Sequence, residues 1–145
     1  MQKMLRWIST VALVVAGGTV VTTSPASAAS CPSAGSSCTG WDPQSTGCSS
    51  SGASTLESFY HGGSGKVELR YSSGCHAAWT RFTSTDDKGG KISIESDDGI
   101  EYQVNLAGYT GEVKWTRMID FSKRVRACHF AYYGGQALWA CSGWH

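Results

Sequence analysis

Six cysteines are the feature that most limits how this chain can fold. They are Cys31, Cys38, Cys48, Cys75, Cys128 and Cys141, an even number. In a small exported domain such a set predicts a disulfide framework, in which each bond typically adds about 2 to 4 kcal/mol of stability. Zinc ligation is the competing interpretation, but the chain has no C-x-x-C pair, so disulfides are favoured.

The connectivity of these cysteines is open, because six cysteines allow fifteen pairings and the sequence does not choose among them. The pairing we expect is the following: Cys38 with Cys48, Cys75 with Cys128, and Cys31 with Cys141. The last of these bonds would bring together the two ends of the part of the chain that contains the cysteines.

Residues 1–28 have the organisation of a secretory signal peptide. Lys3 and Arg6 form a basic head, residues 7–21 are an apolar run, and residues 24–28 end in the small-x-small pattern that signal peptidase accepts. Glycines and threonines interrupt the run, whereas a membrane span needs about 20 mostly apolar residues. We therefore expect cleavage before Ala29, an extracellular protein, and no membrane attachment after the signal is removed.

The charge balance argues against nucleic acid as a partner. Without Lys3 and Arg6, ten basic residues face eleven acidic ones, a net charge of about −1 with histidine neutral. A phosphate-binding domain normally carries a basic surplus on one face. The roughly 117 residues from Ala29 onward suit a single domain whose small core needs support from crosslinks.

The chain changes character near Lys66. Residues 29–65 are a polar segment rich in Ser, Gly and Cys, expected to be irregular and held by crosslinks. Residues 66–145 carry short runs of Val, Ile, Tyr, Trp and Thr separated by Gly and Asp, a pattern typical of β-strands. We expect residues 29–145 to act as one folded unit in which 66–145 form a compact β domain.

Two hairpins and several strands account for that β domain. Apolar and polar residues alternate over 92–104 around the turn Asp97-Asp98-Gly99, and Gly134-Gly135 separates two further runs. The remaining strands are expected at residues 66–71, 76–84, 112–119, 124–132 and 136–141. Since no segment shows helical periodicity, the predicted fold is all-β, an antiparallel barrel or sandwich.

Five spaced blocks carry a family resemblance. They are Cys38-Thr39-Gly40-Trp41-Asp42-Pro43-Gln44-Ser45-Thr46-Gly47-Cys48, Val67-Glu68-Leu69-Arg70-Tyr71-Ser72, Cys75-His76-Ala77-Ala78-Trp79-Thr80-Arg81, Trp115-Thr116-Arg117-Met118 and Val125-Arg126-Ala127-Cys128. Together they resemble the DUF2690 family of small secreted bacterial proteins, which are abundant in actinomycetes and have no defined biochemistry. The resemblance implies an extracellular compartment, and it implies no reaction.

Two acidic residues within these blocks have structural interpretations. Asp42 precedes Pro43, and its carboxylate is expected to accept backbone hydrogen bonds in a rigid turn. A single Asp supplies neither the carboxylate pair of a glycosidase nor the six or more oxygens of a calcium site. Glu68 is expected to pair with Arg81 across the sheet.

Catalytic constellations are sparse. The chain has no G-x-S-x-G elbow, no H-E-x-x-H helix and no phosphate-binding loop. His76 follows Cys75 and His129 follows Cys128, so a disulfide between those cysteines would bring the two imidazoles close together. A small hydrolase or metal-dependent enzyme centred on them is one hypothesis. We predict instead a protein with no catalytic residue, no metal and no cofactor.

Aromatic side chains are the feature best suited to recognition. Trp79 and Trp115 lie within strand patterns, so burial is expected for both. Exposed aromatics anchor protein partners or stack on sugar rings. The predicted binding residues, which flank turns or the chain end, are Trp41, Phe59, Tyr60 and Trp144. A bond between Cys31 and Cys141 would place Trp41 and Trp144 on one patch.

The sequence therefore predicts a secreted, non-enzymatic interaction or adaptor module that binds another extracellular protein. Actinomycetes export multi-component antibacterial particles whose small subunits bridge a scaffold to a lectin, and a chain of this size and compartment suits that role. The alternatives are a cell-wall or polysaccharide-binding module and, from another class, a small secreted hydrolase or metal-dependent enzyme.

Overall fold

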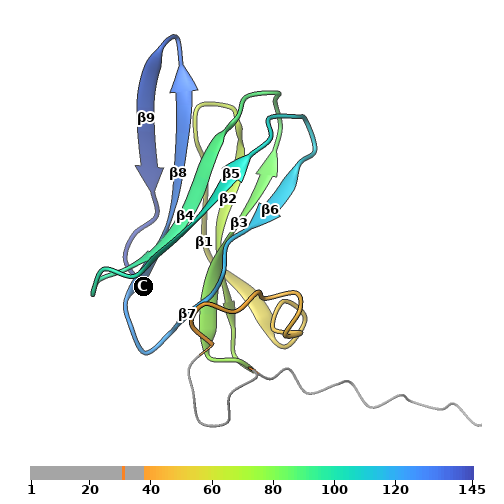
Figure 1. Cartoon of the computed structure of the whole chain (residues 1–145), viewed down its shortest axis with the longest axis vertical. Coiled ribbons are helices and arrows are strands. Elements are labelled where there is room, and N and C mark those ends of the chain that lie inside the picture. The colour runs from red at the N-terminus through yellow and green to blue at the C-terminus, as the bar shows by residue number, and fades with distance from the viewer. Residues whose placement is uncertain (1–30, 32–37) are drawn as a thin grey trace, which may run out of the picture.

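The computed structural model describes Cys31 and residues 38–145, so the predicted signal peptide lies outside the described residues. In this part of the chain nine strands and no helix are present, and the strands form two antiparallel sheets (Figure 1). None of the described residues belongs to a helix that is long and apolar enough to cross a membrane. The all-β prediction is confirmed, and of its two forms the structure is the sandwich.

The two sheets divide the strands as follows. Sheet A has the order β1 (Ala53–Tyr60), β2 (Gly65–Ser72), β3 (Ala77–Ser84) and β6 (Val113–Trp115), with β7 (Ile119–Asp120) also paired to β3. Sheet B has the order β5 (Glu101–Leu106), β4 (Gly90–Ser96), β8 (Val125–Tyr133) and β9 (Gln136–Cys141). Figure 1 shows that the β8–β9 hairpin extends beyond the ends of the neighbouring strands.

The main core lies between the two sheets. Strand alternation sends every second side chain inward, so Val67 and Leu69 of β2 meet Ile92 and Ile94 of β4 in one fully buried cluster. Burying each such side chain contributes about 1.5 to 3 kcal/mol. The other buried members are Ala78, Phe82, Leu106, Ile119, Val125 and Ala127.

A second core lies on the outer face of sheet A. Since Ala78 and Phe82 of β3 face sheet B, Ala77 and Trp79 face the opposite way. Trp79 is nevertheless only 2% exposed, because the segment 38–52 lies over it. We call this segment the cover. The other buried members of the second core are Cys38, Cys48 and Met118.

Most predicted strands are confirmed to within two residues, but two details differ. β1 lies inside the segment expected to be irregular, pairs with β2 along its length, and packs Leu56 and Phe59 against the main core. The strand expected over 112–119 is split, because the Met118 N–H donates to the Trp41 carbonyl (2.9 Å) and the Met118 carbonyl accepts from Gly40 N–H (2.9 Å). The backbone at Met118 thus pairs with the cover instead of with β3.

Candidate interaction surface

The β8–β9 hairpin is a rigid projection from sheet B. Gly134 and Gly135 form its turn with φ of 55° and 81°, the left-handed conformation that a two-residue type I′ turn requires. At its base, Cys128 and Cys141 form a disulfide. The Tyr133 hydroxyl donates to the His61 carbonyl (2.9 Å) in the β1–β2 turn and also contacts the Ser64 hydroxyl. These bonds hold the hairpin in one position.

Large apolar side chains gather on this hairpin. Tyr132 is 62% exposed, Trp139 50% and Leu138 41%, and Phe130 is half-buried. Phe130 and Trp139 are directly opposite each other, with ring centroids 4.9 Å apart, and the Phe130 and Tyr132 rings are also 4.9 Å apart. Phe130, Tyr132 and Trp139 share one face of the hairpin, and we call these three residues the hairpin surface; Leu138, opposite Ala131, lies on the other face.

A cation and an open groove border the hairpin surface. The Lys91 ammonium lies 5.5 Å from the centroid of the Phe130 ring and 5.2 Å from that of Trp139, within cation–π range. It also donates to the Gln103 side-chain oxygen (3.0 Å). The groove has a volume of about 640 Å³. Its lining includes Lys88, Lys91, Asn105, Phe130 and Tyr132.

β9 is an edge strand, and its composition sets it apart. Among the described strands, the other sheet edges carry charged residues, Glu57 in β1, Lys114 in β6 and Glu101 in β5. β9 carries none, over the six residues Gln136–Cys141. Charged residues on an edge discourage pairing with a further strand, and β9 lacks that protection.

The hydrogen bonds between β8 and β9 show which backbone groups of β9 point away from β8. The Ser142 N–H donates to the Ala127 carbonyl (2.8 Å), so Ser142 faces β8. Partners alternate along an antiparallel pair, which turns the N–H and C=O groups of Ala137 and Trp139 away from β8. Within the described part of the chain no strand pairs with that side.

The predicted binding residues lie in separate places. Tyr60 is 69% exposed at the end of β1, and Trp41 is 39% exposed in the cover. Trp144 is 37% exposed, with the Arg126 guanidinium 4.5 Å from its ring centroid. Phe59 is half-buried against the main core. Their role in binding stays a prediction, and the hairpin surface is an additional candidate that the sequence analysis did not single out.

The predicted disulfide pairing is wrong. The structure joins Cys31 to Cys38, Cys48 to Cys75 and Cys128 to Cys141, and not Cys38 to Cys48, Cys75 to Cys128 or Cys31 to Cys141. Cys128 and Cys141 are directly opposite on paired strands, with Cα atoms 4.1 Å apart, whereas Cys75 lies in the β2–β3 turn of the other sheet. The reason for placing Trp41 and Trp144 on one patch is therefore removed.

The predicted proximity of His76 and His129 fails for the same reason. His76 packs instead against the rings of Tyr71 and Phe121. His129 is fully buried and meets His61, with their Nδ1 atoms 3.1 Å apart. Burial, and then the neighbouring His61, lowers the pKa of His129 to about 4, so the imidazole is neutral at pH 7. Among the described residues no third His, Cys, Asp or Glu completes a metal site at this pair.

Asp42 and Glu68, the two acidic residues considered within the blocks that carry the family resemblance, have the predicted structural roles. The Asp42 carboxylate accepts backbone N–H bonds from Gln44 (2.8 Å) and Ser45 (2.9 Å), which confirms the turn. Glu68 accepts a bond from Arg81 Nε (2.7 Å), which confirms the cross-strand ion pair. Both carboxylates are thus held by hydrogen bonds within the fold.

Comparison with known proteins gives one match. A family model described as a protein of unknown function, DUF2690, matches residues 36–129. No curated protein and no solved structure matches the chain. The matched range contains the cover and runs from β1 into β8, and it ends before β9.

Proposed function

This chain belongs to DUF2690, a family of proteins of unknown function, and we propose that it is a secreted interaction module without catalytic activity. Its partner is another extracellular protein, which binds by placing an extended segment along edge strand β9. The module thereby acts as an adaptor.

The observation that carries this proposal is the exposed, uncharged edge of β9. Outward backbone groups at Ala137 and Trp139 offer hydrogen bonds to an added strand. Leu138 and Trp139 project to opposite sides of that strand, so an incoming segment with alternating apolar side chains would contact both. Main-chain bonds supply affinity in this mode of recognition, and the side chains supply specificity.

The rigidity of the hairpin supports tight binding. Ordering a loop on association costs free energy, and a surface that is already ordered avoids that cost. Here the Cys128–Cys141 disulfide and the Tyr133 bond to His61 hold the hairpin in advance. The fixed aromatic Trp139 then serves as the anchor of the contact.

A bridging role in a multi-component particle requires two separate surfaces. The hairpin surface belongs to sheet B, whereas exposed Trp41 belongs to the cover over sheet A. Two exposed aromatic sites on different sheets suit a subunit that contacts two proteins. We extend the proposal to such a bridging subunit of a secreted antibacterial particle.

One observation favours a second candidate, a polysaccharide-binding module. The groove beside the hairpin combines aromatic rings, Phe130 and Tyr132, with the polar side chains of Lys91 and Asn105. Sugar rings stack on aromatics while their hydroxyls bond to polar groups. A cell-wall polymer would therefore bind along the groove and not along the edge.

Capture from culture supernatant, using the tagged chain and two proline variants, tests the proposal. Ala137→Pro removes an outward N–H of β9 and blocks an added strand. Val113→Pro is the matched control, because the Ser84 N–H donates to the Glu112 carbonyl (2.8 Å), so Glu112 faces β3 and Val113 faces outward on edge strand β6 of the other sheet. We expect a stoichiometric protein partner with the parent and with Val113→Pro, and its loss with Ala137→Pro.

Other outcomes separate the alternatives. If Ala137→Pro still captures the partner, strand addition at β9 is excluded. Retention of the chain on peptidoglycan or chitin, without a protein partner, would favour the polysaccharide-binding module. A lone monomer with hydrolytic activity would favour an enzyme.

A further inference from the structure

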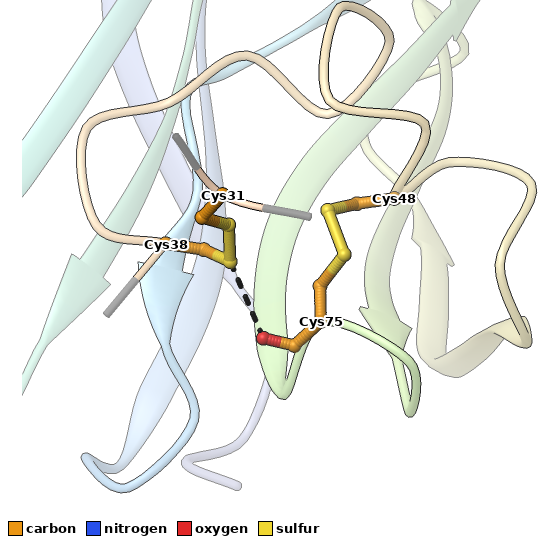
Figure 2. A group of neighbouring side chains, drawn as sticks. All are labelled: Cys31, Cys38, Cys48 and Cys75. Carbon is orange, nitrogen blue, oxygen red and sulfur yellow. Dashed lines mark hydrogen bonds between the residues drawn. A yellow bond between two sulfur atoms is a disulfide. The ribbon is translucent and has the colours of Figure 1, made fainter. Parts of the chain in front are cut away.

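Four of the six cysteines form one compact sulfur cluster, independent of the surface proposed above. The Sγ atoms of Cys31, Cys38, Cys48 and Cys75 all lie within 4.8 Å of one another. Figure 2 shows the two disulfides side by side where the cover meets the β2–β3 turn. The Cys38 sulfur is also 3.3 Å from the Cys75 carbonyl oxygen.

The surroundings of the cluster resemble those of a structural metal site, closed on one side and accessible on the other. Cys48 is fully buried and Cys38 is 5% exposed, backed by the apolar side chains of Trp79 and Met118. Cys31 and Cys75 are half-buried and leave a path to solvent. A site of this kind excludes bulk water and still admits an ion.

The backbone spacing of the four cysteines permits a tetrahedral ion once the disulfides are reduced. Zinc binds thiolates at about 2.3 Å in a tetrahedron, which places the sulfurs about 3.8 Å apart. The Cα atoms of the bonded pairs are 5.3 Å and 5.7 Å apart, so side-chain rotation suffices to separate each sulfur pair to that distance. We propose that the reduced form of this chain binds one zinc ion through Cys31, Cys38, Cys48 and Cys75.

Zinc binding and the disulfides exclude each other. A disulfide sulfur is not a thiolate, so the oxidised chain has no ligand to offer. In the reduced chain, one Zn²⁺ displaces four protons from four thiols and forms four Zn–S bonds, with no electron transferred. A newly synthesised chain contains these thiols before any disulfide forms. The ion would then hold the cover against sheet A at the same position that the disulfides hold later.

Cobalt substitution tests this site. The full chain is reduced with a phosphine under anaerobic conditions and titrated with Co²⁺, then with Zn²⁺, while absorption is recorded. We expect one Co²⁺ per chain with the intense visible bands of a tetrahedral tetrathiolate, and displacement by one equivalent of Zn²⁺. The untreated, oxidised chain should bind neither ion.

Variants assign the ligands. Cys128→Ser with Cys141→Ser removes the distant pair and should leave the titration unchanged. Cys31→Ser should weaken Zn²⁺ binding by roughly a hundredfold or more, because it removes one ligand of four, and losing only a hydrogen-bonding partner of a ligand already costs about 10- to 100-fold. Circular dichroism follows folding throughout, and structure that returns only with zinc supports the site.

Three results would overturn the proposal. The first is the absence of a one-to-one complex with Co²⁺ or Zn²⁺, including the case in which the reduced chain stays unfolded with zinc present. The second is a Co²⁺ spectrum that indicates fewer than four sulfur ligands. The third is equal Zn²⁺ affinity in Cys31→Ser and the parent.

Discussion

The outer face of sheet A is covered by another segment of the chain, whereas the outer face of sheet B stays exposed at the hairpin. On sheet A the crosslinked cover buries Trp79 to 2% exposure, whereas on sheet B the hairpin leaves Trp139 50% exposed. Both regions contain a disulfide, but Cys48–Cys75 fastens a separate segment over a sheet, and Cys128–Cys141 joins two adjacent strands of one sheet. The first crosslink creates core, and the second stiffens a surface that remains available for binding.

The two tryptophans give the largest expected difference. Trp79→Ala should lower the free energy of unfolding by about 3 to 5 kcal/mol, because it leaves a cavity under the cover. Trp139→Ala should lower it by less than about 1 kcal/mol, since half of that side chain is already in water. Urea denaturation at pH 7 measures both. Similar losses in the two variants would contradict the distinction between a closed face and an open one.

Removal of the disulfides sharpens the same distinction. Replacing Cys48 and Cys75 by Ala should cost about 3.5 kcal/mol for their separation of 27 residues, and should shift the tryptophan emission of the chain to the red as the cover detaches and Trp79 becomes exposed. Replacing Cys128 and Cys141 by Ala should cost about 3 kcal/mol for a separation of 13 residues, without that shift. A red shift of equal size in both double variants would show that the cover does not depend on Cys48–Cys75.

The difference between the regions also marks what the sequence predicts and what it leaves open. The hairpins follow from local signals, because Gly99, Gly134 and alternating side chains fix turn and register within a few residues. The disulfide pairing depends on which segment covers which face, a contact between distant parts of the chain. Cys48 meets Cys75 only because the cover lies over Trp79.

The sequence also does not show which strands lie at a sheet edge, because that too depends on contacts between distant parts of the chain. β1 contributes only Leu56 and Phe59 to the main core and has a register irregularity between Thr55 and Glu57, so its pattern does not stand out from a polar segment. The sequence does not distinguish Trp139 as a binding residue, because the alternation of side chains is the same in an edge strand as in a central one. The usable signal was the absence of charge over residues 136–141.

Acid should weaken the junction between the hairpin and the core. His129 on β8 has a pKa near 4 in the folded chain, against about 6.5 when unfolded, because burial and then His61 disfavour its charged form, although Asp86 favours it. The unfolded chain therefore binds a proton first as the pH falls. The stability from this group is complete above about pH 6.5, and on the order of 2 to 3 kcal/mol is lost on the way to pH 4.

The variant His129→Gln tests this dependence. It keeps a hydrogen-bonding side chain toward His61 but does not titrate, so its unfolding free energy should change much less between pH 6.5 and 4 than that of the parent. The slope with pH is the measurement, whatever the absolute stability of the variant. Parallel slopes in the two proteins would exclude His129 as the cause.

The affinity of tryptophan variants for the captured partner shows which region binds it. Trp139→Ala should weaken binding of that partner by about 2 kcal/mol, roughly thirtyfold, because truncating a fixed aromatic anchor commonly costs that much binding free energy. Trp41→Ala and Trp144→Ala serve as comparisons in the same titration, since the sequence predicted binding there. A loss confined to Trp41→Ala would assign this partner to the cover and not to the hairpin.

The smallest expected effect lies in the cover itself, at Asp42. Its carboxylate accepts bonds from Gln44, Ser45 and the Trp115 indole N–H (3.0 Å). Burial alone would raise the pKa of Asp42, but the bonds from Ser45, Trp115 and Gln44 hold it below its ordinary value. Asp42→Asn replaces one acceptor oxygen by an NH₂ group, which cannot accept a hydrogen bond. The variant should lose about 1 kcal/mol of unfolding free energy at pH 7.

The pH dependence of that loss identifies its origin. Because the folded pKa of Asp42 is depressed, its contribution is complete above the unfolded value of about 3.9 and disappears as the pH falls through the folded value. The difference between the parent and Asp42→Asn should therefore narrow below about pH 4. Exposed Asp87→Asn is the control and should match the parent. A difference that persists unchanged at low pH would mean that the amide disturbs packing under the cover, and that the charge of Asp42 contributes nothing to holding it on sheet A.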